Sequence, residues 1–498
     1  MQFRKKINKV MLLFPTGKVL KWRFHHCEIP MGLAYLAAVL RNDFDVKVLD
    51  GRAKFQRMVP KNSKWEYFGF TPKEIVEQVK TYSPDVVGIS CLSSFHFPDV
   101  VDLFERVKKI DNDIITVTGG THPTFLADEV MKKHSSIDFI VMGEGEDTFY
   151  QLLMNINSEK EYDALDGLAF RNNGTYQINP KTKYIEDLDA LPYPAFDLFP
   201  LDFYEKKSIP FSVTFRSKKT IPILTSRGCS AQCIFCASKN YWGKRYRMRT
   251  AENVLDEIEY MVKKYGVEEI QFIDDNLTLD KNRARKIFQG LIDRNINIHW
   301  NTPNGIAVWT LDEQMLKLMK ASGCYELTVA FESGDQEVLN NIIKKPLDLK
   351  YAKKMVNKMK DLDIQVHSFF ISGFPGETKE QIKRSFAFAK TMDLDSAWFF
   401  VANPTPGSEL YEICKNEGYI NDDFSFENIE YSLSHIKNKE FTPREMEKLI
   451  ITQFNNYNLG QMVKHPIRFL KKYLGVIISH PIMSLRTILA DMLCFIGK

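Results

Sequence analysis

Three closely spaced cysteines constrain this chain more than any other feature. Cys229, Cys233 and Cys236 have the spacing C-x3-C-x2-C and come soon after the apolar run 221–224, which is typical of a buried strand. Thiolates suit iron–sulfur clusters, and three of them on one loop can hold three irons of a [4Fe–4S] cube. Structural zinc usually takes four protein ligands, and no second CxxC or CxxH lies nearby. The spacing therefore predicts a cluster whose fourth iron is open to a non-protein ligand.

Further motifs follow the cysteine loop in order. They are Asp274-Asp275-Asn276, Ala330-Phe-Glu332-Ser-Gly334, Ile371-Ser-Gly-Phe-Pro-Gly-Glu377-Thr and Asn403-Pro-Thr-Pro-Gly407-Ser-Glu-Leu-Tyr411. With the cysteine loop, they resemble radical S-adenosylmethionine (SAM) enzymes over roughly residues 215–440. The resemblance implies that the open iron chelates the amino-acid end of SAM. It also implies reductive cleavage of SAM to a 5′-deoxyadenosyl radical, which abstracts a hydrogen from an unactivated carbon.

The same part of the chain contains six strand-like runs, each followed by a helical pattern except at the last. Six βα units fit a partial (β/α)6 barrel, open over a quarter of its circumference, and the resemblance implies this shape too. Active residues of parallel barrels gather at the carboxyl ends of strands, where all of the motifs above lie. The expected strands are 220–225, 268–273, 297–302, 325–331, 364–372 and 395–402.

The resemblance gives roles to individual residues, beginning with the three cysteines as cluster ligands. Glu332 would accept hydrogen bonds from the ribose hydroxyls of SAM, with a helix-capping carboxylate as the structural alternative. Asp275 and Asn276 match the position that contacts the ammonium group of SAM. Backbone near Gly373 would approach the adenine, and strand alternation points further side chains toward the barrel mouth. The expected SAM-binding residues are Phe235, Asp275, Asn276, Asn304, Glu332, Ser372 and Gly373.

Residues 1–155 alternate short β-rich runs with helical patterns. Five apolar strands separated by helices imply an α/β domain with a parallel sheet covered on both faces, Rossmann-like or flavodoxin-like. Ligands of such domains bind beyond the carboxyl ends of the strands. The expected strands are 10–14, 46–50, 86–90, 114–118 and 139–142.

Small and polar residues follow these strands, and small residues let the backbone approach a flat ligand. Taken alone, the glycines are also explained as structural turns. However, Pro30-Met-Gly-Leu-Ala-Tyr-Leu-Ala-Ala, Thr118-Gly-Gly-Thr-His122 and Gly143-Glu-Gly-Glu146 resemble the cobalamin-binding domain that precedes many radical SAM cores. The expected cobalamin-binding residues are Ser90, Ser93, Ser94, Gly119, Gly120, His122, Gly143 and Glu144.

One position departs from the pattern of cobalamin domains that supply an axial histidine. Those domains carry Asp-x-His-x-x-Gly, whereas this chain has Asp50-Gly-Arg52 at the equivalent place. Cobalamin would therefore lack a histidine ligand from this motif. His122 is better explained as a residue that packs the loop than as a substitute ligand.

Two segments flank the barrel core. Residues 156–214 are irregular, with Leu191-Pro-Tyr-Pro as a stiff connection, and are expected to be a linker across both domains. Residues 441–498 are helical in pattern, and from Lys464 onward they carry six Lys/Arg and one Asp. Apolar faces with basic flanks describe either a helix lying in an anionic membrane surface or a helical cap packed on the barrel.

Composition limits the remaining choices. At 498 residues, two or three domains are expected, and a composition of 44% hydrophobic and 26% charged residues is globular. A net charge of +4 is too small to indicate nucleic acid binding. The cysteines outside the loop are scattered, which excludes a secreted disulfide framework. No signal peptide or membrane-spanning stretch is recognisable, so a cytoplasmic protein is expected, with the tail as a contact to the inner face of the membrane in one alternative.

The leading hypothesis is a cobalamin-dependent radical SAM enzyme that methylates a carbon, with methylcobalamin as the methyl donor. If the tail binds a membrane, the substrate would be lipid-like or porphyrin-like. Ring closure or carbon–carbon coupling with the same cofactors is the near alternative. Transfer RNA modification is disfavoured because neither a cysteine-rich N-terminal domain nor a C-terminal β-barrel module is recognisable, and a cobalamin sensor would not need the SAM motifs. The expected partners are a small-molecule or lipid substrate and an electron donor such as flavodoxin or ferredoxin, without nucleic acid.

Overall fold

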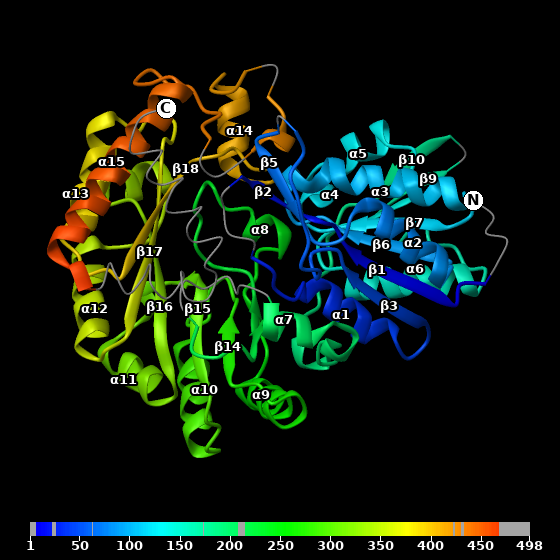
Figure 1. Ribbon diagram of the computed structural model, residues 1–498, viewed down its shortest axis with the longest axis horizontal. Helices are drawn as coiled ribbons and strands as arrows, with labels where there is room; N and C mark the ends of the chain where they lie inside the picture. Colours follow the sequence, from blue (N-terminus) through cyan, green and yellow to red (C-terminus); the bar gives the residue numbers. More distant parts are fainter. Residues whose placement is uncertain are drawn as a thin grey trace.

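The computed structural model describes residues 6–21, 26–61, 63–172, 174–207, 215–421, 424–429 and 433–467. Two mainly parallel sheets lie side by side, one in the blue and cyan part of the chain and one in the green to orange part (Figure 1). A single hydrophobic core runs through both: it includes Leu12 and Phe149 from the first part and Trp300 and Phe331 from the second. The mixed α/β fold class predicted from the sequence is confirmed.

The N-terminal sheet has seven strands in the order β10-β9-β8-β7-β6-β1-β3. All five expected strands are present and parallel, as predicted. Two antiparallel strands that were not expected extend this sheet, so it continues past residue 155 to Ile178. The strands are β1 (Lys9–Phe14), β3 (Asp45–Asp50), β6 (Val86–Ser90), β7 (Ile115–Gly119), β8 (Phe139–Val141), β9 (Leu168–Asn172) and β10 (Thr175–Ile178).

Helices cover both faces of this sheet. Side chains of α1 (Met31–Leu40) and α6 (Glu146–Asn157) enter the core that continues into the second part. Side chains of α2 (Pro72–Tyr82), α3 (Phe97–Ile110) and α5 (Ala127–Lys133) form a separate core on the other face. A small antiparallel sheet contributes Phe68 to the first of these cores and is made of β2 (Gly17–Leu20), β5 (Trp65–Phe68) and β4 (Arg57–Met58).

The second sheet is the predicted partial barrel. Its six strands are parallel in the order β11-β14-β15-β16-β17-β18, so β11 and β18 are its open edges. They are β11 (Thr220–Ile223), β14 (Glu269–Phe272), β15 (His299–Ile306), β16 (Cys324–Glu332), β17 (Gln365–Ser372) and β18 (Ser396–Val401). The helices that follow are α9 (Ala251–Tyr265), α10 (Lys281–Asp293), α11 (Glu313–Ala321), α12 (Leu349–Asp361), α13 (Lys379–Lys390) and α14 (Glu409–Asn416).

Each barrel helix starts at a side chain that caps it. The capping oxygen accepts a hydrogen bond from the backbone N–H three residues later, which satisfies one of the donors left free at a helix start. These caps fix where each strand-end loop stops and its helix begins. The capping residues are Thr250, Asp280, Asp312, Asp348, Thr378 and Ser408.

Helix α15 (Pro443–Lys464) packs against α13 at the outside of the barrel (Figure 1). Met446, Ile450 and Tyr457 are buried on its inner face, whereas Leu459 and Val463 are exposed on the other. No helix among the described residues is long and apolar enough to cross a membrane. The basic tail predicted from the sequence lies mostly beyond residue 467, outside the described residues.

Candidate active site

The cysteine loop leaves the carboxyl end of β11 and is held by backbone hydrogen bonds from three directions. Its base forms the short strand β12 (Ser226–Arg227), which pairs with β13 (Arg247–Met248). In the loop, Ile234 N donates to Ile343 O (3.0 Å), and Ile234 O accepts from Leu410 N (2.8 Å). Backbone hydrogen bonds to other parts of the barrel therefore hold the cysteine loop in place.

The three thiols fit a cluster that takes one thiolate per iron. Burial raises the pKa of Cys233 to about 11 and that of Cys236 to about 12, so iron binding would displace protons. Ser238 N lies 3.5 Å from Sγ of Cys236, and Asn276 Nδ2 lies 3.8 Å from Sγ of Cys229. Hydrogen bonds to sulfur are typical of iron–sulfur sites. Among the described residues, no three acidic, His or Cys side chains are placed to bind one and the same metal ion. A [4Fe–4S] cluster does not require this, because each thiolate binds a different iron.

The three polar residues after β14 have different hydrogen-bond partners. Asp274 is buried and accepts hydrogen bonds from Thr225 N and Oγ1 at the base of the cysteine loop. Asp275 accepts from Ser238 Oγ at 2.5 Å, and burial raises its pKa. The buried Oδ1 of Asn276 has no hydrogen-bond partner in the described part of the chain. An unpaired acceptor beside the thiols fits the ammonium group that the sequence predicts at this position.

Glu332 ends β16 and lies in the left-handed region of backbone conformation, with φ of +65°. Its carboxylate is only 5% exposed and accepts a hydrogen bond from Lys345 Nζ at 3.1 Å. It pairs with this lysine and does not cap a helix. At a nearby strand end, Asn304 Nδ2 donates to Ile273 O at 2.8 Å.

The loop after β17 is closed by Glu377, which accepts from Gly373 N (2.6 Å) and Phe374 N (3.1 Å). Burial raises the pKa of Glu377 to about 8. The Phe374 ring lies 6.1 Å from that of Phe235, so this loop and the cysteine loop meet as predicted for an adenine site. Ser372 Oγ is buried, without a hydrogen-bond partner among the described residues.

The cobalamin residues expected from the sequence lie at neighbouring strand ends of the N-terminal sheet. Gly120 has φ of +103°, and a Cβ there would lie 2.5 Å from Cys91 O, so only glycine fits. His122 stacks on Phe97 with ring centroids 4.0 Å apart, and burial lowers its pKa to about 3. Its ring packs inside the loop, and its contact with cobalamin stays a prediction. The other expected residues at these ends are Ser90, Ser93, Ser94, Gly119 and Gly143.

Arg52, at the position where related domains carry a histidine, is fully engaged. Its guanidinium donates to Asp50 (3.1 Å) and to Glu28 O (2.6 Å) and lies 4.2 Å from the Phe14 ring centroid. Asp50 also accepts from Tyr204 at 2.6 Å. A guanidinium has no lone pair to offer a metal, so Arg52 could not coordinate the cobalt of a bound cobalamin.

A buried ion-pair network joins the two domains. Arg227 donates to Glu144 (2.7 Å) and to Glu146 (2.6 Å), and Arg247 donates to Glu144 (2.7 Å). Burial alone would raise the pKa of Glu146, but Arg227 outweighs it and the pKa is lowered. Both oxygens of Glu144 are occupied, so this side chain links the domains, and its contact with cobalamin stays a prediction. The role of both arginines was not predicted from the sequence, although two buried carboxylates after an apolar strand require cationic partners.

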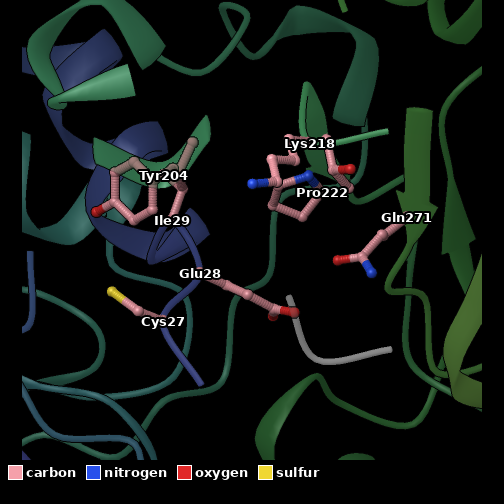
Figure 2. A pocket seen from close by; sticks show the side chains of 8 residues that line it. Cys27, Glu28, Ile29, Tyr204, Lys218, Pro222 and Gln271 are labelled. Atoms are coloured by element: carbon pink, nitrogen blue, oxygen red, sulfur yellow. The ribbon is translucent and has the colours of Figure 1, made fainter. Parts of the chain in front are cut away.

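A small pocket of about 20 Å³ lies between the domains, enough for one water molecule. Figure 2 shows the Glu28 side chain between Cys27 and Gln271. None of the expected cofactor residues lines it. Its lining residues are Cys27, Glu28, Ile29, Tyr204, Lys218, Thr220, Pro222 and Gln271.

Comparison with known proteins identifies both domains. Residues 17–153 match the family model of the B12 binding domain, and residues 223–389 match that of the radical SAM superfamily. The chain is 32% identical over 461 residues to cytidylyl-2-hydroxyethylphosphonate methyltransferase of Streptomyces wedmorensis, covering 86% of this chain and 85% of that protein. It belongs to the cobalamin-dependent radical SAM methyltransferase family. It is a radical SAM enzyme whose cofactors are a [4Fe–4S] cluster, SAM and cobalamin.

Two further matches place it among its relatives. The anaerobic magnesium-protoporphyrin IX monomethyl ester cyclase of Rubrivivax gelatinosus is 26% identical over 343 residues, covering 68% of this chain and 60% of that protein. The solved structure of the cobalamin-dependent SAM radical enzyme OxsB, with aqua-cobalamin and SAM bound, superposes with a TM-score of 0.70. The superposition covers 96% of this chain and 72% of OxsB. Because the two sequences are only 15% identical, this match supports the fold alone.

We expect Arg227→Met to lower the free energy of unfolding by about 3–5 kcal/mol, because it leaves Glu146 buried without its partner. Urea-induced unfolding followed by tryptophan fluorescence measures the change. Arg41→Met is the matched control, since Arg41 pairs with Asp197 at 2.7 Å but at the surface. It should cost less than about 1 kcal/mol. Equal effects of the two substitutions would contradict the role of the network.

Proposed function

We propose that this enzyme transfers a methyl group to an unactivated carbon of its substrate through a radical generated from SAM. When bound, the cluster and SAM supply the radical and cobalamin supplies the methyl group. The observation that carries the proposal is the Arg227 junction. Arg227 lies two residues before Cys229 and is bonded to Glu144 and Glu146, which follow β8 at the proposed cobalamin edge. Radical source and methyl donor would therefore be neighbours.

Individual residues would then serve as follows. Cys229, Cys233 and Cys236 hold the cluster, and the unpaired Oδ1 of Asn276 accepts from the SAM ammonium. Glu332 accepts from the ribose hydroxyls. Backbone of the Gly373 loop and of the cysteine loop borders the adenine, and the closed loops exclude water from the radical. An external one-electron donor such as flavodoxin or ferredoxin would reduce the cluster.

Ring closure or carbon–carbon coupling is the second candidate, because the relative in Rubrivivax gelatinosus is a cyclase. Products separate the two reactions. Methyl transfer by this route consumes SAM both as radical source and as methyl source, so it forms 5′-deoxyadenosine and S-adenosylhomocysteine together. Ring closure or coupling forms 5′-deoxyadenosine without the second product.

The test is an anaerobic assay of the enzyme reconstituted with iron, sulfide and cobalamin, given SAM, reductant and a cell lipid extract. We expect matched amounts of 5′-deoxyadenosine and S-adenosylhomocysteine by mass spectrometry, both dependent on the extract. Cys233→Ala should abolish cluster absorbance and both products, because one cluster ligand is lost. Cys324→Ala, which changes a buried cysteine on β16, is the control and should retain both. Retained SAM cleavage in Cys233→Ala would refute the assignment.

We further propose that the substrate is hydrophobic and is taken from an anionic membrane surface. The outer face of α15 supports this, since Leu459 is 45% and Val463 77% exposed, whereas Met446 and Ile450 on the inner face are buried. Ile467, three residues after the helix ends, is 68% exposed. A helix that is apolar on both faces needs a second apolar environment. Lys464 and the basic residues that follow in the sequence suit anionic lipid head groups.

We expect the full chain to co-sediment with vesicles containing phosphatidylserine, less so at high salt. Val463→Glu/Ile467→Glu should weaken binding at least about tenfold, because two charges then face the lipid. Phe55→Glu/Val59→Glu is the control: it places the same charges on exposed apolar residues elsewhere and should not change binding. Equal binding by both double variants would reject the membrane contact.

A further inference from the structure

A buried lysine lies beside the cysteine loop. The π-helix η5 (Val338–Ile343) ends where Ile343 O bonds to Ile234 N of that loop, and Lys344 turns the chain with φ of +61°. This turn directs Lys345 inward, where its side chain is 7% exposed. Its Nζ lies 3.1 Å from Oε1 of Glu332.

Lys345 has more hydrogen-bonding capacity than the protein uses. An ammonium group has three N–H donors, and the described residues supply one acceptor, Oε1 of Glu332. Nζ also lies 5.3 Å from the centroid of the Trp309 ring, which takes no conventional hydrogen bond. Leaving a buried cation partly unsatisfied is unfavourable. Two donor directions are thus available to a ligand.

Three other cations near the loop are held by acidic partners, whereas Arg283, at the base of the loop, donates to the carbonyl oxygens of Thr225 and Arg249 and keeps one nitrogen, Nη1, without a partner among the described residues. Lys239 and Lys344 both pair with Glu409, at 3.5 and 2.6 Å. Arg227 is enclosed by Glu144 and Glu146. Among the residues that the structure describes around the loop, Lys345 therefore combines burial, charge and spare donors.

Its charge also acts on the cluster ligands. Burial alone would lower the pKa of Lys345, but Glu332 and Cys233 outweigh it and the pKa is raised. Conversely, Lys345 opposes the rise that burial imposes on the pKa of Cys233. The ammonium is thus held in its charged form within electrostatic reach of both the thiols and Glu332.

We infer that Lys345 binds the carboxylate of the amino-acid end of SAM. SAM carries one carboxylate and one ammonium group, and the site offers a spare donor on Lys345 and a spare acceptor on Asn276. One carboxylate oxygen of Glu332 would stay bonded to Lys345 while Glu332 also accepts from the ribose hydroxyls. The Lys345–Glu332 pair would thereby hold both the amino-acid end and the ribose of SAM. The inference rests on the proposed function, since it needs SAM at the cluster.

The test compares two ligands that differ only by the carboxylate, SAM and decarboxylated SAM. Their dissociation constants are measured by equilibrium dialysis on the cobalamin-loaded enzyme with an oxidised cluster and no reductant, so that no turnover occurs. Lys345→Gln should weaken SAM at least about tenfold and decarboxylated SAM by less than about twofold. Lys345→Arg, which keeps the charge, should retain the preference of the wild-type enzyme for SAM.

Equal weakening of both ligands by Lys345→Gln would overturn the inference and leave Lys345 as a residue that positions Glu332. Unchanged SAM affinity would also overturn it. If the single variant does not reconstitute, Lys345→Gln/Glu332→Gln leaves no unpaired buried charge and should still reduce the preference for SAM over its decarboxylated form at least about fivefold relative to the wild-type enzyme. A wild-type enzyme that does not bind SAM would instead refute the proposed function.

Discussion

The contact between Arg227 and the two carboxylates Glu144 and Glu146 determines how the rest of the molecule can work. It fastens the carboxyl edge of the N-terminal sheet to the base of the cysteine loop, and Arg247 reinforces it on Glu144. Buried ion pairs gain little net stability, because removing charges from water costs about as much as their attraction returns. The benefit here is position: the expected cobalamin edge of the N-terminal sheet and the cysteine loop of the barrel are held in one fixed arrangement.

Around this junction the site leaves several polar groups incompletely satisfied. Asn276 Oδ1 and Ser372 Oγ are buried without hydrogen-bond partners among the described residues, and Lys345 uses one of its three donors. Unsatisfied buried groups reduce stability, so folded proteins retain few of them. These three groups lie where SAM is expected, and the cosubstrate would complete their bonds. Glu377 is only half satisfied as well: its Oε2 accepts from Gly373 N and closes the loop, whereas its buried Oε1 has no partner among the described residues.

Much of this was predictable from the sequence, because the determining patterns are local. The cysteine spacing, the strand-end motifs and the apolar runs of both sheets correspond to the observed elements. Strands of two to four residues, such as β2 and β4, are too short to show alternation, so the small antiparallel sheet was missed. The partners Arg247 and Glu144 are 103 residues apart, and no pattern along the chain pairs them. Lys345 was missed because its inward direction depends on a π-helix and a left-handed turn at Lys344.

If the cofactors bind as proposed, cobalamin and the cluster lie on either side of the Arg227 junction at a fixed separation. Pulsed dipolar electron paramagnetic resonance between paramagnetic cobalt and the reduced cluster measures that separation directly in the loaded enzyme. We expect one narrow distance distribution in the wild-type enzyme and a broader one when Arg227 is replaced by methionine. A broad distribution in the wild-type enzyme, or the absence of dipolar coupling with both centres present, would contradict it.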